Sequence, residues 1–131
     1  MTASGSKVSE QRAPYGREVT GEELLQHPEW GRCELIRGEV IWMSPSGGRH
    51  VLIAGRIITY LGIHVLEHGL GEVLGSEGGI YIELNPDTVR APDLMYVSRI
   101  RIPKDGFPEG YLRFAPDLAV EVLSPSDRMK D

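Results

Sequence analysis

The sequence predicts an α+β domain of short strands and a few helices. Its 131 residues have the length of one domain. The 16 glycines and 9 prolines are more than usual for a soluble protein, which favours many turns between short strands. Apolar residues recur with the helical period over residues 49–68, whereas they alternate or form short runs over residues 33–43, 72–84 and 118–123.

The N-terminal region divides into a tail and the start of the domain. Residues 1–17 are polar and are expected to form a flexible tail, so the domain is expected to span residues 18–131. Thr20-Gly21-Glu22-Glu23 has the spacing of a capping box and predicts a short helix, which ends at His27-Pro28. The following strands are predicted to pair as a hairpin around Arg37-Gly38.

The longest predicted helix covers residues 49–68. Apolar side chains at i, i+3 and i+4 spacing form one face of it: Val51, Ala54, Ile57, Ile58, Leu61 and Val65. His50 projects onto the same face in the first turn, where a polar ring needs a hydrogen-bond partner. Two interpretations stay open, a core histidine bonded to a backbone carbonyl and a histidine that lines a functional site.

Two near-copies of one phrase, Ala91-Pro92-Asp93-Leu94 and Ala115-Pro116-Asp117-Leu118, each predict a buried strand that begins after Pro-Asp. Glu121 interrupts the second apolar run, and a buried carboxylate requires a cation or a donor. If the two strands are antiparallel, Asp93 approaches Glu121. Asp117 then lies at the far end, roughly 13 Å from Glu121 at about 3.3 Å per residue. The sequence therefore predicts a carboxylate pair.

Charge and composition limit the classes of partner. The net charge of −5 provides no general basic surface, so a nucleic acid must meet a local patch. The most basic short stretch contains Arg99, Arg101 and Lys104, which are candidate contacts to a nucleic-acid backbone. The single cysteine, Cys33, excludes an internal disulfide and fits a reducing compartment. We find no apolar run suited to a membrane span or a signal peptide, so a cytoplasmic location without a membrane partner is expected.

Several segments, in their order along the chain, resemble the Uma-two family of restriction-endonuclease-like proteins, within the PD-(D/E)XK nuclease superfamily. The resemblance extends from about Val19 to the last residue, and these segments carry it: Glu34 to Val40, His50, Arg90 to Asp93 and Pro116 to Pro125. It implies a mixed β-sheet flanked by helices, as in restriction endonucleases. It also implies hydrolysis of phosphodiester bonds in DNA with Mg²⁺ or Mn²⁺.

The resemblance also implies roles for individual residues. Asp93 and Glu121 would be the metal ligands, Glu34 an auxiliary catalytic carboxylate and His50 a catalytic-site donor, with Arg90 a further candidate contact to the nucleic-acid backbone. By spacing alone, Glu34 is instead expected to be a solvated acid on a strand face.

The chain departs from the superfamily pattern in two places. The superfamily's lysine normally lies two residues after the glutamate, where this chain has Leu123. In similar sequences of the family the lysine comes from the following helix, and Lys130 does not fall on the matching position. The domain is thus expected to be incomplete at its C-terminus, beyond the helix that Ser124 begins.

An incomplete domain would leave a sheet edge and an apolar face uncovered, so we expect a homodimer. Nuclease activity could be absent from this form of the chain. Two other functions therefore remain open. One is a catalytically silent binding or assembly module with the nuclease fold. The other is a small-molecule enzyme that uses the same carboxylates.

Overall fold

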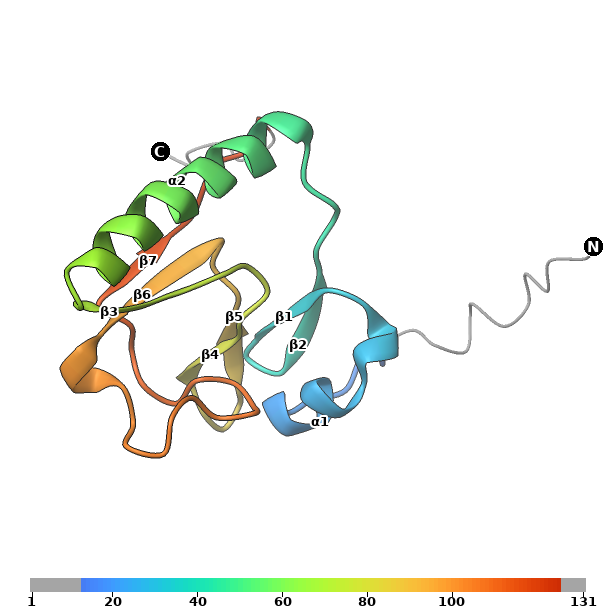
Figure 1. Ribbon diagram of the computed structural model, residues 1–131. Coiled ribbons are helices and arrows are strands. Elements are labelled where there is room, and N and C mark those ends of the chain that lie inside the picture. Colours follow the sequence, from blue (N-terminus) through green and yellow to red (C-terminus); the bar gives the residue numbers. More distant parts are fainter. Residues whose placement is uncertain (1–12, 126–131) are drawn as a thin grey trace, which may run out of the picture.

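Within residues 13–125, which the computed structural model describes, seven strands form two antiparallel sheets (Figure 1). The first sheet has the strand order β2-β1-β5-β4, with β1 at Cys33–Ile36, β2 at Glu39–Trp42, β4 at Ile80–Glu83 and β5 at Thr88–Arg90. The second has the order β3-β6-β7, with β3 at Gly71–Leu74, β6 at Leu94–Ser98 and β7 at Leu118–Val120. The predicted α+β class is confirmed. Among the described residues, the parallel component of the expected mixed sheet is an isolated bridge between Ile80 and Leu112.

The N-terminal elements form as their local sequence predicts. Helix α1 (Gly21–Gln26) begins where the Thr20 hydroxyl accepts a hydrogen bond from the Glu23 amide at 3.1 Å. It ends at His27, and the 3₁₀-helix η3 (Pro28–Trp30) follows. In the β1–β2 hairpin, Arg37 and Gly38 have φ angles of 48° and 80°, as a type I′ turn requires. These elements bury one apolar cluster, which consists of Val19, Leu24, Trp30, Leu35 and Val89.

Helix α2 (Gly48–Glu67) confirms the longest predicted helix and lies against β3 of the second sheet (Figure 1). Val65, on the predicted apolar face, is 2% exposed. Val51 was predicted to lie on the same face but is 55% exposed. Further apolar side chains of α2 are exposed in the part of the chain that is described, and these are Leu52, Ile53, Tyr60, Ile63 and Leu66. By length and composition alone α2 could cross a membrane, whereas no apolar run suited to a membrane span was expected from the sequence. Core helices of water-soluble proteins share that length and composition, so the feature does not by itself assign a membrane.

Strand β6 is the central strand of the second sheet, and β7 is an edge strand. Leu94, Met95 and Val97 of β6 have no exposed surface. The second Pro-Asp strand was expected to be buried on both faces through Leu123. It ends instead at Val120, with Leu123 65% exposed, because only β6 pairs with it among the described residues. The helix expected after Ser124 lies mostly outside the described residues.

Candidate active site

The pairing of β6 with β7 places Asp93 beside Glu121. The register is antiparallel, with Leu94 opposite Val120. Just beyond it, the Asp93 amide donates to the Val120 carbonyl at 3.1 Å, and the Val122 amide donates to Asp93 Oδ2 at 2.7 Å. The predicted antiparallel approach of the two carboxylates is therefore confirmed.

The second Pro-Asp phrase has a different environment. Asp117 Oδ2 accepts a hydrogen bond from the Ser98 amide at 2.6 Å, and this bond lowers the pKa of Asp117 more than any other influence. Asp117 thus fastens β7 to the far end of β6, as its predicted position implied. The chain consequently contains two similar Pro-Asp phrases with different surroundings, which makes Asp117 a natural control for Asp93.

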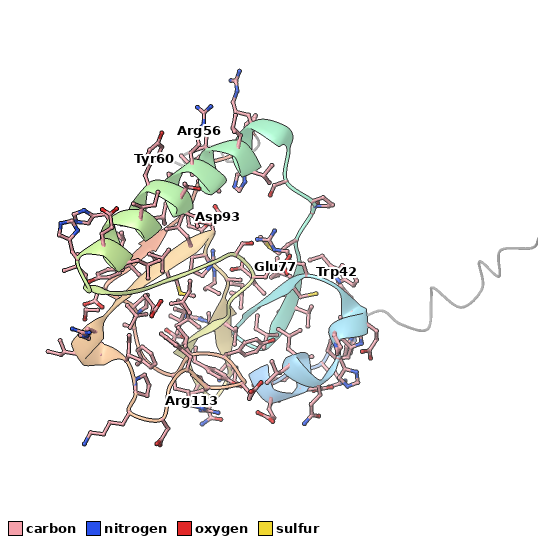
Figure 2. All side chains as sticks on the ribbon, in the orientation of Figure 1. Trp42, Arg56, Tyr60, Glu77, Asp93 and Arg113 are labelled. Atoms are coloured by element: carbon pink, nitrogen blue, oxygen red, sulfur yellow. The ribbon has the colours of Figure 1, made fainter. Side chains whose placement is uncertain are left out.

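A cavity of about 540 Å³ brings together four residues singled out in the sequence, Glu34, His50, Asp93 and Glu121. They come from β1, from the first turn of α2, and from the adjoining ends of β6 and β7. Trp42, at the end of β2, also lines the cavity, and Figure 2 labels it together with Asp93, which lies under α2. The cavity therefore lies between the two sheets and the start of the long helix.

Glu34 is buried, with 6% of its surface exposed, so the expectation from spacing of a solvated acid was wrong. Its Oε2 accepts a hydrogen bond from the Ala91 amide at 2.7 Å and forms an ion pair with Arg90, whose Nε lies 3.2 Å away. Strand β1 is an interior strand of its sheet, and its neighbour β5 leads directly into the segment that supplies these donors. Burial is tolerated because this hydrogen bond and the ion pair satisfy the carboxylate.

His50 and Asp93 form a pair below the start of α2. His50 Nε2 lies 3.2 Å from Asp93 Oδ2, and the two side chains are 11% and 8% exposed. His50 Nδ1 is buried and has no hydrogen-bond partner among the described residues. In the described structure, His50 therefore lines the cavity against a carboxylate and is not bonded to a backbone carbonyl.

Glu121 differs from the other two carboxyl groups. It was expected to be the buried anomaly, but it is exposed while Glu34 and Asp93 are buried. Desolvation raises the pKa of Glu121 first, and the negative charges of Asp93 and Glu34 raise it further. The positive charges of Arg90 and Arg32 act in the opposite direction. The cavity therefore concentrates negative charge that a cation would relieve.

The basic residues Arg99, Arg101 and Lys104 do not line this cavity. They follow the opposite end of β6, and a five-residue strand separates that end from Asp93 by roughly 17 Å. Arg101 Nη1 contacts the Ala115 carbonyl at 3.2 Å and Asp117 Oδ1 at 3.7 Å. Any contact of this cluster with a nucleic acid would thus involve a surface apart from the cavity. Arg90 lines the cavity, and so does Arg32, which no sequence pattern marked as a candidate.

The carboxylates suit a cation that takes few protein ligands. Among residues 13–125, no three His, Cys, Asp or Glu side chains are grouped closely enough to hold a metal by themselves. However, Asp93 Oδ1 and both Glu121 oxygens accept no hydrogen bond from the described residues. Mg²⁺ usually binds through one or two carboxylates and keeps several waters. Asp93 and Glu121 therefore suit an ion such as Mg²⁺. They are too few for a structural metal site, in which protein side chains supply all the ligands.

Glu121→Gln is expected to raise the stability of the metal-free protein at neutral pH. Because the folded-state pKa of Glu121 is raised, the folded protein holds the proton more tightly than the unfolded chain. Stability of the wild type therefore falls as pH rises through the interval from the ordinary value of 4.5 up to the raised pKa. Thermal unfolding in EDTA at pH 4 and pH 7 measures this. The stability gained by Glu121→Gln over wild type should be larger at pH 7 than at pH 4. An equal or smaller gain at pH 7 would contradict the raised pKa of Glu121.

Comparison with known proteins concerns the family and the fold of the chain. Residues 22–131 match the Uma2 family, described as putative restriction endonucleases. The fold is similar to the crystal structure of a putative nuclease belonging to DUF820 from Anabaena variabilis, with 24% identity and a TM-score of 0.66. The similarity covers 84% of this chain and 61% of that protein, so it extends over less than two thirds of that protein's length. No curated protein matches the sequence significantly. Since the family match covers most of the sequence, the chain belongs to the Uma2 family of putative restriction endonucleases.

Proposed function

We propose that the protein is a nuclease that hydrolyses phosphodiester bonds of DNA with Mg²⁺ or Mn²⁺ bound in the cavity. The observation that carries this proposal is the meeting of Glu34, Asp93 and Glu121 in one cavity, in a member of an endonuclease family. The cavity also contains the cationic side chains of Arg32 and Arg90. Carboxylates and cations together suit a substrate whose reacting phosphate is anionic.

Asp93 and Glu121 would hold the metal ion through the oxygens that accept no hydrogen bond from the described residues. When bound, the ion supplies positive charge to the phosphate and lowers the pKa of a water molecule. His50 and the Val122 amide both engage Asp93 Oδ2, which orients the other oxygen of Asp93. His50 and Val122 would therefore position Asp93 as a ligand of the metal ion.

Glu34 is the candidate general base. The Ala91 amide and Arg90 hold its Oε2, so the orientation of the carboxylate is fixed while Oε1 accepts no described hydrogen bond. A carboxylate oriented in this way can accept a proton from the attacking water. Arg90 Nε lies 3.2 Å from Glu34 Oε2, and half of the Arg90 side chain stays exposed to solvent.

Cleavage of supercoiled plasmid DNA tests the proposal. The wild-type chain is expected to nick or linearise the plasmid in Mg²⁺ or Mn²⁺, and to leave it intact in EDTA. Intact plasmid under all three conditions would contradict the nuclease assignment. Cleavage of single-stranded or structured RNA with none of DNA would contradict the choice of substrate.

An assembly module with the nuclease fold is the second candidate function. Leu123 provides no lysine, the Arg90–Glu34 pair already satisfies one carboxylate, and α2 exposes Tyr60, Ile63 and Leu66. We therefore expect a homodimer in sedimentation at micromolar concentration, and Ile63→Asp should shift it towards monomer if α2 forms the interface. A dimer that binds no cation and cleaves no nucleic acid would favour this module. A strictly monomeric wild type would contradict it.

A further inference from the structure

We propose that Arg32 is the phosphate-binding cation of the cavity. The residue lies immediately before β1, and its backbone carbonyl accepts a hydrogen bond from the Met43 amide at 3.0 Å. Side chains of a strand alternate, so Arg32 and Glu34 project from the same face, two residues apart. Both line the cavity with Asp93 and Glu121. The inference rests on the proposed function, because it names the part of the nucleic acid that this site would bind.

Carboxylates already engage the other two basic side chains of the cavity, those of Arg90 and His50. Arg90 Nε lies 3.2 Å from Glu34 Oε2, and His50 Nε2 lies 3.2 Å from Asp93 Oδ2. Arg32 forms no ion pair with any described residue, and its Nε is buried without a hydrogen-bond partner. Of these three groups, Arg32 alone therefore remains available to a ligand.

A buried guanidinium N–H without an acceptor is unfavourable, and such groups in folded proteins ask for an explanation. The neighbouring carboxylates do not provide an acceptor for the Nε of Arg32. The charge of Arg32 is near enough to Glu121 to lower the pKa of that carboxyl, yet no ion pair joins the two side chains in the described structure. An oxygen atom of a bound ligand would satisfy the donor.

The ligand that suits this position is a phosphate. A guanidinium presents its donors as a planar fork that matches two oxygens of a phosphate, and it remains charged at every relevant pH. Three carboxylates line the same cavity, so a phosphate that enters needs a compensating charge on the protein as well as the metal ion. Leu123, two residues after Glu121, is uncharged and does not line the cavity. Arg32 is thus placed to bind and position a backbone phosphate beside Glu34.

The experiment compares wild type, Arg32→Gln, Arg32→Lys and the control Arg56→Gln. Arg56 is an exposed residue of α2 and its substitution removes the same charge outside the cavity (Figure 2). Binding of a short fluorescent DNA duplex is measured by anisotropy in Ca²⁺, which takes the same kind of oxygen ligands, over a series of salt concentrations. Binding of inorganic phosphate is measured separately by calorimetry.

Arg32→Gln is expected to weaken duplex binding about tenfold and to reduce the slope of log Kd against log salt by about 0.9, the effect of losing one phosphate contact. Arg32→Lys should restore part of the affinity and the full slope. Arg56→Gln should change neither quantity by as much. Equal affinities and slopes for wild type and Arg32→Gln would overturn the inference, even where the wild type cleaves DNA.

Two further measurements separate this inference from its alternatives. If the wild type cleaves no DNA, the proposed function fails, and inorganic phosphate then decides the role of Arg32. Weaker phosphate binding by Arg32→Gln than by wild type supports the inference, and equal binding overturns it. Thermal unfolding identifies a merely structural role. A large loss of stability in Arg32→Gln with unchanged phosphate binding would also overturn the inference.

Discussion

Asp93→Asn is expected to lower the rate of DNA cleavage by about 10³-fold or more, because it removes a charged metal ligand. Loss of several kcal/mol of charge stabilisation corresponds to a rate change of that order. The amide of asparagine has nearly the same shape as the carboxyl group. Its oxygen can still accept the hydrogen bond that the Val122 amide donates to Asp93 at 2.7 Å. The fold should therefore survive while the chemistry is lost.

Asp117→Asn is the matched control for this substitution. Both aspartates follow Ala-Pro and precede leucine, and both accept a hydrogen bond from a backbone amide. Asp117 lies at the other end of β7 and does not line the cavity. Plasmid cleavage by this variant should stay within a few-fold of wild type. Equal losses in the two variants would show that general stability, and not the cavity, accounts for the effect.

Leu35→Ala is expected to lower the free energy of unfolding by about 3 kcal/mol, within the range for a buried leucine that leaves a cavity. Leu35 has no exposed surface and pairs with Val40 and Val89 in the first sheet. Because whole domains are stable by only about 5–15 kcal/mol, this substitution removes a large part of the total. Denaturation in urea, followed by circular dichroism, measures the change.

The control for Leu35→Ala is Leu84→Ala, which makes the same change at a side chain that is 56% exposed. Its effect should stay within about 0.5 kcal/mol. Equal losses at the two positions would contradict the placement of Leu35 in the centre of the apolar cluster.

The elements set by neighbouring residues could be predicted from the sequence. The Thr20 cap, the Arg37-Gly38 turn and the helical period of α2 each depend on interactions within a few positions. The approach of Asp93 to Glu121 followed from two strands that begin after Pro-Asp, together with an antiparallel arrangement. That long-range contact was predictable because strand geometry converts register into neighbours.

The surroundings of Glu34 and Arg32 could not be predicted in the same way. Alternation assigns them to one face of β1, but it does not say what covers that face. The answer depends on the pairing of β1 with β5, a strand of only three residues that the sequence pattern did not show. The Ala91 amide that Glu34 bonds follows directly after β5, so the surroundings of Glu34 are a consequence of this pairing. An isolated acid or base in a short strand looks the same whether it is solvated or functional.

The basic cluster after β6 lies apart from the cavity, and its contact with a nucleic acid stays a prediction. Arg99 and Arg101 were candidate contacts to a nucleic acid because of their charge alone. A strand of five residues necessarily separates them from Asp93, so their distance from the cavity could have been calculated from the same geometry that placed Glu121. Position along the strand, and not charge, determines whether such a cluster lies at the cavity.

Titration calorimetry with Mg²⁺ and Mn²⁺ tests most directly the claim that Asp93 and Glu121 form a cation site. Wild type and Asp117→Ala are expected to bind the cation equally, and Asp93→Ala is expected to lose binding. In the wild type, affinity should fall as the pH is lowered through the raised pKa of Glu121, since the proton competes with the cation for that carboxyl. Equal binding by wild type and Asp93→Ala would contradict the account.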